Sequence, residues 1–304
     1  MEIDSLQGNE VEDHGPHALT SILIPTFNCE EYLVRCLQSA ITQSYRQIEI
    51  VVQDNASTDQ TWSIIEDFAA QHSQVKPERS SANVGPLQNW QRALQRCKGE
   101  FVKILWADDW MDHRCIEECI RALICKPDAS LVFTAVMKHA RDCETPLYHH
   151  PFRTTFTAAQ FLTQTLLQDN MPFSPGSCLL RRRDAKFELM EGSSEKTLNA
   201  GRNFGAGPDV LLMLSAAASS KVVLHIPKFL NHFTDRPDNF TSAHCSEVFA
   251  AYREVFALFL ADTKAKAEVS GFSQVFRRAE RYKQWRLRFA KPLKDSFRRL
   301  AGLD

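Results

Sequence analysis

The chain has 304 residues, of which 44% are hydrophobic, and a formal net charge of −1 at pH 7. This length and apolar content suffice for a sizeable buried core, so we expect one large globular domain, alone or with an extension. The small net charge argues against a general nucleic-acid-binding surface, and nine cysteines without a Cys-x-x-Cys pair indicate neither a disulfide framework nor a zinc ribbon.

Residues 1–17 are acidic, lack lysine and arginine and have little apolar content, so we expect a flexible tail. The N-terminus lacks the basic-then-apolar order of a signal peptide. No apolar run reaches the ~18 residues that a membrane span needs. Together with the cysteine pattern, these features favour a cytoplasmic protein.

From residue 20 onward, apolar runs of strand length alternate with apolar residues at helical spacing. The strands are expected at 20–24, where Pro25 stops the run, and at 48–52, 101–105 and 130–136. The helices between them are expected at 33–41, 62–69, 87–97 and 116–124. This alternation predicts an α/β fold with a mainly parallel central sheet covered by helices on both faces.

The pattern becomes less regular after residue 138. A helix is expected at 161–166, a strand at 176–180, and a helix at 210–218 with Asp209 in its first turn. The arginines that follow the strand, Arg181 to Arg183, are interpreted as a solvated strand end in preference to a phosphate site.

Polar loops follow the strands that end near Ile24, Val52 and Leu105. In a parallel sheet these loops meet at one edge, where ligands bind in such folds. The third loop carries Asp108 and Asp109, and paired carboxylates at a strand end indicate either a metal site or an Asp-rich turn. The sequence alone leaves both interpretations open.

Three other carboxylates have a structural alternative to a functional role. Asp54 and Asp59 fit loop-turn and helix-capping positions, and Asp209 after Pro208 complements a helix dipole. The glycine-rich phosphate loops of nucleotide hydrolases and dinucleotide enzymes are absent from the sequence. A metal ion on carboxylates is therefore the expected means of holding a phosphate.

Four segments, in this order, resemble the successive motifs of family 2 glycosyltransferases with the Rossmann-like GT-A fold. They are Ser21 to Asn28, Glu49 to Asp59, Asn83-x-Gly85, and Gly99 to Asp109. The resemblance covers residues 19–136 well and 170–240 loosely. It implies a GT-A domain at 18–240, with a nucleotide-binding half at 18–136 and an acceptor half at 137–240.

The resemblance also implies roles for single residues. Pro25 and Thr26 would line the nucleotide pocket, and Asp54 would hydrogen-bond the base, commonly uracil. Asp108 would ligate Mn²⁺ or Mg²⁺ with Asp109 as its neighbour at the metal site. Asp209 would be the catalytic base. The remaining positions assigned to nucleotide binding are Asn28, Asn83, Gly85, Ala107 and Asp108 itself.

The implied function is an inverting, metal-dependent glycosyltransferase in polysaccharide or glycoconjugate biosynthesis. It would move a sugar from a nucleoside-diphosphate donor, expected to be a UDP-sugar, to a hydroxyl of a saccharide or lipid-linked acceptor. Trp106 stands where the family has the first carboxylate of Asp-x-Asp. Two alternatives stay open: a non-catalytic nucleotide-binding or assembly subunit, which Trp106 favours, and a sugar-phosphate nucleotidyltransferase.

Residues 241–304 are expected to form a helical C-terminal extension that is basic and amphipathic. Between Arg277 and Arg299, ten basic residues stand against two acidic ones. The extension would either pack on the catalytic domain with its basic side in solvent or dock on the anionic inner face of the cell membrane.

Membrane docking predicts salt-sensitive binding to anionic liposomes, because each basic residue near an anionic surface contributes about 1 kcal/mol. Deletion of residues 271–304 should abolish this binding, as measured by co-sedimentation. Equal binding to neutral and anionic vesicles would contradict the prediction.

Overall fold

The computed structural model describes residues 18–167, 170–185 and 207–236, together with Tyr252, Val255 and Phe259. The tail expected at 1–17 lies outside the described residues, as does the extension at 241–304 apart from those three. The tail, the extension and the two halves of residues 18–240 therefore stay predictions.

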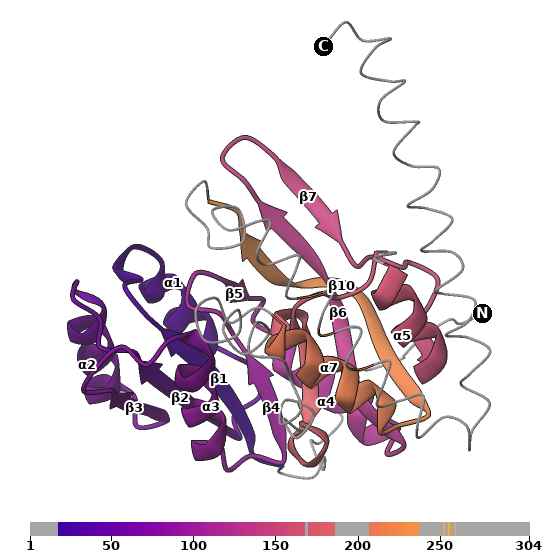
Figure 1. Ribbon diagram of the computed structural model, residues 1–304, viewed down its shortest axis with the longest axis horizontal. Helices are drawn as coiled ribbons and strands as arrows, with labels where there is room; N and C mark the ends of the chain where they lie inside the picture. Colours follow the sequence, from indigo (N-terminus) through magenta and orange to yellow (C-terminus); the bar gives the residue numbers. More distant parts are fainter. Residues whose placement is uncertain are drawn as a thin grey trace, which may run out of the picture.

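Within the described residues, ten strands form one sheet (Figure 1). Its first part is parallel, with β1 (Thr20–Thr26) between β2 (Ile48–Asp54) and β4 (Phe101–Ile104), and β3 (Val75–Arg79) beside β2. Three helices connect these strands: α1 (Glu30–Ile41), α2 (Thr61–Gln71) and α3 (Pro86–Arg96). The parallel pairing brings the ends of β1, β2 and β4 to one edge, as the sequence predicted.

The second part of the sheet is mixed. Strand β9 (Cys178–Arg181) runs antiparallel between β4 and β6 (Ala129–His139), whereas β10 (Val222–Thr234) runs parallel to β6. Three short antiparallel strands extend these two long strands: β5 (Trp110–Met111), β7 (Glu144–Leu147) and β8 (Thr155–Thr157). Parallel pairing is therefore confined to the first four strands and to β6 with β10.

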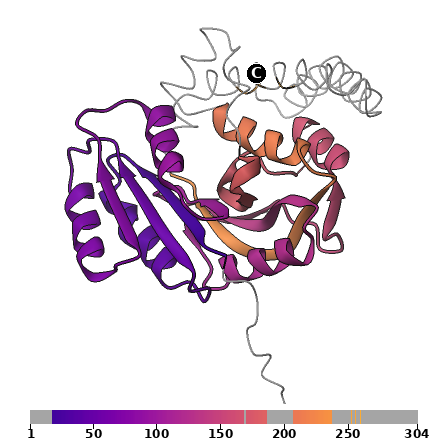
Figure 2. The same ribbon diagram turned by 90° about the horizontal axis from the view of Figure 1, so that it is seen from below.

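Helices cover both faces of the sheet (Figure 2). One hydrophobic cluster packs α1, α2 and α4 (Cys115–Cys125) against the strands. A second cluster on the other face contains α3, α5 (Ala158–Leu167) and α7 (Pro208–Ala218). The expected α/β fold with both sheet faces covered is confirmed.

The expectation that Pro25 stops the first strand is wrong. Strand β1 continues to Thr26 and pairs with β2 along its whole length, including Pro25 with Gln53. On its other side, β1 pairs with β4 only as far as Leu23. Pro25 therefore lies where one side of β1 is no longer paired, and a residue without a backbone N–H is tolerated there.

Two other expectations need correction around residue 180. The strand expected at 176–180 begins at Cys178, after a short 3₁₀ turn η1 (Pro175–Ser177). Arg181 is not solvated, because its Nε donates to Ala129 O (2.8 Å) and its Nη2 to Leu123 O (2.8 Å). Arg181 thus satisfies carbonyl groups at the end of α4 and the start of β6, which a phosphate site would leave unpaired.

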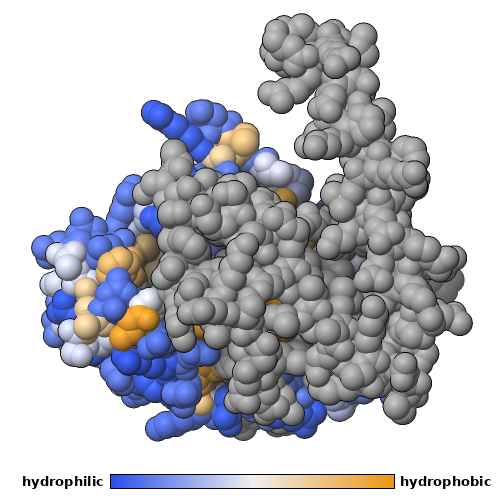
Figure 3. All heavy atoms as spheres, viewed as in Figure 1, coloured by the Kyte–Doolittle hydropathy of each residue, from blue (hydrophilic) through white to orange (hydrophobic). Residues whose placement is uncertain are grey.

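The described part of the face in Figure 3 is mainly hydrophilic. The large hydrophobic side chains exposed among the described residues are Phe27, Val34 and Phe152. None of the described helices has the length and apolar character to cross a lipid bilayer.

Candidate functional site

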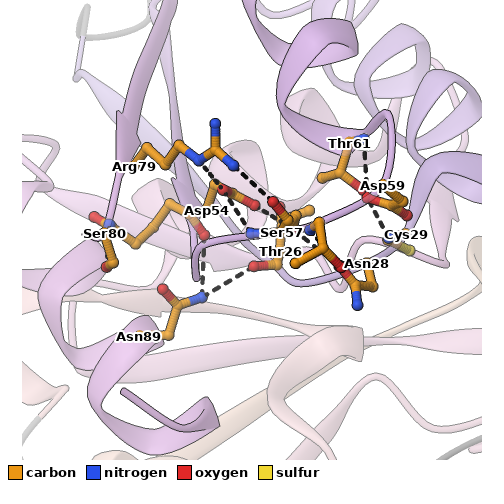
Figure 4. Close-up of polar contacts among 12 residues, drawn as sticks. Thr26, Asn28, Cys29, Asp54, Ser57, Asp59, Thr61, Arg79, Ser80 and Asn89 are labelled. Atoms are coloured by element: carbon orange, nitrogen blue, oxygen red, sulfur yellow. Dashed lines mark hydrogen bonds and ion pairs between the residues drawn. The ribbon is translucent and has the colours of Figure 1, made fainter. Parts of the chain in front are cut away.

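The loops after β1 and β2 are joined by hydrogen bonds (Figure 4). The backbone N–H of Asn28 donates to Ser57 Oγ (2.9 Å), and the N–H of Thr58 donates to Asn28 Oδ1 (2.9 Å). Asn28 has a φ of 44°, a conformation that asparagine tolerates better than most residues. Two of the predicted nucleotide-binding loops therefore form one rigid unit.

Asp54 lies at the end of β2, and its side chain is fully buried. Its carboxylate accepts hydrogen bonds from the Ser57 backbone N–H (3.1 Å) and from Ser57 Oγ. Arg79 Nε lies 3.3 Å from Asp54 Oδ2, and Arg79 also donates to Ser57 O (2.6 Å). Ser57 and Arg79 thus compensate the buried charge of Asp54 and fix the loop after β2 (Figure 4).

Asp59 binds the start of two helices. Its Oδ1 accepts a hydrogen bond from the backbone N–H of Thr61, the first residue of α2, and its Oδ2 accepts one from Glu30, the first residue of α1. A carboxylate at a helix N-terminus satisfies unpaired N–H groups and complements the helix dipole. The helix-capping interpretation of Asp59 is therefore confirmed.

Asn83 and Gly85 shape the turn before α3. Asn83 Oδ1 accepts hydrogen bonds from Asn55 Nδ2 (2.9 Å) and from the Gly85 N–H (2.9 Å). Gly85 has a φ of 82° immediately before Pro86, which only glycine adopts without strain. The turn is thus tied to the end of β2, and Asn83 itself is exposed there.

Three other predicted nucleotide-binding residues differ in exposure. Thr26 is 2% exposed and Ala107 is 7% exposed within the core, whereas Pro25 is half-buried.

Asn89 was not predicted to belong to the site, and its Nδ2 donates to Gln53 O (3.0 Å) and Thr26 O (3.4 Å). These bonds hold the ends of β1 and β2 together (Figure 4).

Asp108 follows β4 at the same edge of the sheet, and its side chain is 23% exposed. Arg236 Nε lies 3.4 Å from Asp108 Oδ2. The backbone carbonyl of Asp108 accepts hydrogen bonds from Arg35 Nη2 (3.3 Å) and from Thr234 Oγ1. The end of β10 and helix α1 therefore position the loop that carries this carboxylate.

Asp109 has a different environment. Its side chain is 7% exposed, and its Oδ1 accepts a hydrogen bond from the Thr234 backbone N–H (2.9 Å). Burial, followed by the neighbouring charge of Asp108, raises the pKa of Asp109 well above its usual range. Asp109 thus anchors the loop to β10, and its metal-binding role stays a prediction.

The donor set fits a divalent ion held largely by its substrate. Among the described residues, no group of three or more His, Cys, Asp or Glu side chains has the arrangement of a complete metal cage. Mg²⁺ in particular is usually bound by one or two carboxylates together with substrate phosphates and water. The partly exposed carboxylate of Asp108 matches that requirement.

Asp209 lies in the first turn of α7 and is 7% exposed. Its Oδ1 accepts a hydrogen bond from the Gly207 N–H (2.9 Å), and Tyr252 Oη donates to its Oδ2 (3.4 Å). Burial raises the pKa of Asp209 to about 7, because desolvation outweighs these hydrogen bonds. A carboxylate of this pKa can exchange a proton near neutral pH.

A series of contacts links the Asp108 loop to Asp209. Trp106 Nε1 donates to Ser174 Oγ (2.8 Å), and a Cβ at Gly176 would lie 3.0 Å from the Trp106 ring. The adjacent Phe173 ring lies 6.1 Å from that of Tyr252, which contacts Asp209. Trp106 thus packs on the segment between α5 and β9 that leads toward the buried acid.

Lys103 also holds the segment between α5 and β9 in place. It is 1% exposed, and its Nζ donates to Ile104 O (2.9 Å) and to Gly176 O. Burial lowers the pKa of Lys103, as expected for a desolvated ammonium group. Lys103 thus ties β4 to η1, a contact that its position in a predicted strand did not indicate.

Arg236, Arg35 and Tyr252 were also missed. Arg35 had a weak sequence signal, since it lies on the polar side of an amphipathic helix next to a predicted loop. Arg236 and Tyr252 had none, because their contacts depend on how distant segments pack.

Comparisons with known proteins agree with the fold and the order of the motifs. The sequence profile of Glycosyl transferase family 2 matches residues 21–187. Chondroitin synthase of Escherichia coli is 28% identical over 150 residues, which cover 49% of this chain and 21% of that protein. The E. coli UDP-Glc:alpha-D-GlcNAc-diphosphoundecaprenol beta-1,3-glucosyltransferase WfaP is 33% identical over 92 residues, covering 30% of this chain and 36% of that protein.

The solved structures that resemble this chain share its fold at low sequence identity. Residues 1–349 of S. aureus TarS in complex with UDP-GlcNAc superpose with a TM-score of 0.60 and 20% identity, covering 78% of this chain and 65% of that one. The mannosyltransferase PcManGT from Pyrobaculum calidifontis, in complex with GDP-Man and Mn²⁺, gives a TM-score of 0.52 and 16% identity over 93% of this chain and 80% of that one.

The chain thus spans about a fifth of the length of the E. coli chondroitin synthase that it matches. The profile match nevertheless covers more than half of the chain, and it includes all four sequence motifs and the loops at the sheet edge. The chain therefore belongs to glycosyl transferase family 2.

Proposed function

We propose that this protein is an inverting, metal-dependent glycosyltransferase that moves a sugar from a nucleoside-diphosphate donor to a hydroxyl group of its acceptor. The observation that carries the proposal is the presence of two carboxylates in different environments, which a series of side-chain contacts connects. Asp108 is partly exposed at the sheet edge, whereas Asp209 is buried with a pKa of about 7, and the contacts of Trp106, Phe173 and Tyr252 link them.

The loops after β1 and β2 would bind the nucleotide. Ser57 and Arg79 hold the buried Asp54 carboxylate in a fixed position, and a base that binds there would replace part of these contacts. Asn28, Asn83 and Gly85 lie around this rigid unit. UDP-GlcNAc in TarS and UDP-Glc in the name of WfaP support a UDP-sugar donor.

A Mn²⁺ or Mg²⁺ ion on Asp108, when bound, would neutralise the negative charge that develops on the departing nucleoside diphosphate. Mn²⁺ in the PcManGT complex supports this assignment. The protein contributes the position of the Asp108 carboxylate, which Arg35 and Thr234 fix through the backbone carbonyl of the same residue.

Asp209 would accept the proton of the acceptor hydroxyl as that oxygen attacks the anomeric carbon. The Gly207 N–H and Tyr252 Oη both donate hydrogen bonds to Asp209 and stabilise its ionised form in the buried site. Attack from the face opposite to the leaving diphosphate inverts the anomeric centre in a single displacement.

The acceptor would be a saccharide or a lipid-linked saccharide. The aromatic side chains between the two carboxylates are partly buried and offer apolar surface near Asp209. The E. coli chondroitin synthase and the diphosphoundecaprenol substrate in the name of WfaP support this acceptor class. A cytoplasmic location at the inner face of the membrane, with the C-terminal extension as contact, accords with a lipid-linked acceptor.

Release of nucleoside diphosphate from a panel of nucleotide sugars, with and without Mn²⁺, tests the proposal. An enzyme of this class should release it with Mn²⁺ and a suitable donor, through slow hydrolysis even without acceptor. The alternative of a non-catalytic subunit rests on Trp106, which cannot contact a ribose as a carboxylate does. Donor binding without any release would favour that alternative.

Asp54→Asn is expected to weaken nucleotide binding by about 1.5–3 kcal/mol, the contribution of a hydrogen bond to a charged group. The substitution preserves an acceptor for Ser57 while removing the charge. Isothermal titration with UDP measures the effect. Asp59→Asn is the matched control, because it alters a carboxylate of the same loop that binds helix N-termini. Equal UDP affinity in the Asp54 variant and the wild type would withdraw the base-binding role.

A further inference from the structure

Arg236 provides a counter-charge to Asp108. The two side chains are similarly accessible, 24% and 23% exposed, and Arg236 Nε lies 3.4 Å from Asp108 Oδ2. The guanidinium group also lies 5.0 Å from the centre of the Tyr32 ring. Because both groups are partly exposed, the ion pair is weak enough to be exchanged for another partner.

A divalent ion on Asp108 would compete with this ion pair. Because a divalent ion carries twice the charge of a guanidinium group, its binding to the Asp108 carboxylate would displace Arg236. Arg236 would then need another anion, and a donor diphosphate held by that ion would lie within the same small region.

The backbone near Arg236 is held in place by several bonds. The Thr234 N–H donates to Asp109 Oδ1 (2.9 Å), Thr234 Oγ1 donates to Asp108 O, and the Asp235 N–H donates to His139 O (2.8 Å). These bonds keep the end of β10 against the loop that carries Asp108. A released Arg236 side chain therefore remains within reach of a ligand at Asp108.

Arg35, the other arginine at this loop, is committed elsewhere. It donates to Asp108 O (3.3 Å) and to Thr234 Oγ1 (2.9 Å), and its guanidinium group lies 3.7 Å from the centre of the Trp110 ring. These contacts are with a backbone carbonyl, a hydroxyl and an aromatic ring, and none of them is with the Asp108 carboxylate. Arg236 is the arginine whose observed partner is the predicted metal ligand itself.

We propose that Arg236 exchanges partners on donor binding: it neutralises Asp108 before the metal binds, and it then binds the diphosphate of the nucleotide sugar. This inference rests on the proposed function. The planar guanidinium group suits phosphate oxygens because it donates two parallel hydrogen bonds. Arg236 thus lowers the affinity for the metal ion in the absence of donor. It raises the affinity for the donor once the metal ion is bound.

Arg236→Gln should therefore have opposite effects on two affinities. Affinity for Mn²⁺ alone, measured by electron paramagnetic resonance of free Mn²⁺, should rise several-fold because a competing cation is removed. Affinity for UDP in the presence of saturating Mn²⁺, measured by calorimetry, should fall about 10- to 100-fold because charge-assisted hydrogen bonds are lost. UMP, which lacks the second phosphate, should show a smaller loss.

Two further variants complete the design. Lys138 Nζ lies 2.6 Å from Oδ2 of Asp235, the residue before Arg236. Lys138→Gln removes this positive charge and should change neither affinity. Arg236→Lys retains the charge without the fork of donors, so it should restore wild-type Mn²⁺ affinity and recover UDP affinity only in part. Thermal unfolding of each variant confirms that it is folded.

Unchanged Mn²⁺ affinity in Arg236→Gln, or a loss of both affinities, would overturn the exchange. If the wild-type protein binds neither UDP nor GDP with Mn²⁺, the proposed function fails. The titration with Mn²⁺ alone still decides in that case whether Arg236 competes with metal at Asp108.

Discussion

Replacing Asp209 by asparagine is expected to reduce sugar transfer by about 10²–10⁴-fold, the usual contribution of general base catalysis, while donor binding persists. Asparagine can still accept a hydrogen bond from the Gly207 N–H and can pair with Tyr252, so the start of α7 should be preserved. Single-turnover transfer assays and calorimetry with donor separate these two quantities. A small loss of transfer would return Asp209 to a purely structural role at the helix start.

The same substitution should stabilise the protein at high pH. Burial raises the pKa of Asp209 from 3.8 to about 7, so the folded state favours the protonated acid. The stability from this group is complete below about pH 4 and is lost as the pH rises through 7. Three pKa units correspond to at most about 4 kcal/mol. The asparagine side chain carries no charge, so urea unfolding should show a more stable variant at pH 8 and a similar one at pH 4.

Transfer by the wild-type enzyme should correspondingly increase as the pH rises through about 7, where Asp209 becomes ionised. Activity that is independent of pH between about 5.5 and 8.5 would contradict the assignment of Asp209 as the base. A stability gain without a loss of transfer would show that the buried acid is present for another reason.

Asp108→Asn is expected to lower turnover by about 10³-fold or more, because the metal ion contributes several kcal/mol of transition-state stabilisation. The variant should also lose the dependence of UDP affinity on Mn²⁺. The fold should be retained, because the side chain is 23% exposed and stands outside the core. Calorimetry with UDP, with and without Mn²⁺, measures the effect apart from turnover.

Asp112→Asn is a suitable control for Asp108→Asn. Asp112 lies four residues further along the chain, and its carboxylate accepts a hydrogen bond from the Arg114 backbone N–H (3.0 Å). Its substitution removes one negative charge near the same loop but should leave the effect of Mn²⁺ unchanged. If Asp108→Asn retained metal-dependent binding, Asp108 would no longer be assigned as a ligand.

The α/β fold and the sheet edge at which the loops after β1, β2 and β4 meet were predictable from the sequence. Each unit of the first half is a strand, a loop and a helix that follow one another in the chain. The spacing of apolar residues within a short stretch is therefore enough to predict it. The loops that carry Asn28, Asp54 and Asp108 follow parallel strands, and parallel pairing places them together without further information. Asp209 was located at a helix start for the same local reason.

Strand limits were less well determined, because pairing partners decide them. The strand run was expected to end at Pro25, but β1 continues since β2 pairs with it beyond that residue. Strand β3 was not predicted, because its residues are mostly exposed and polar and Val75 is its buried residue. Arg181 was expected to be solvated, yet it is buried because the carbonyl groups at the end of α4 and the start of β6 need donors.

Only the tertiary structure distinguished between the adjacent carboxylates Asp108 and Asp109. Asp109 is buried and accepts a hydrogen bond from the Thr234 backbone N–H, whereas Asp108 is partly exposed and faces Arg236. Those partners come from the end of β10 and the residues that follow it, far from the loop in the chain. Likewise, the raised pKa of Asp209 arises from desolvation by burial. Desolvation and long-range pairing depend on the assembled fold, so no local pattern in the sequence could reveal them.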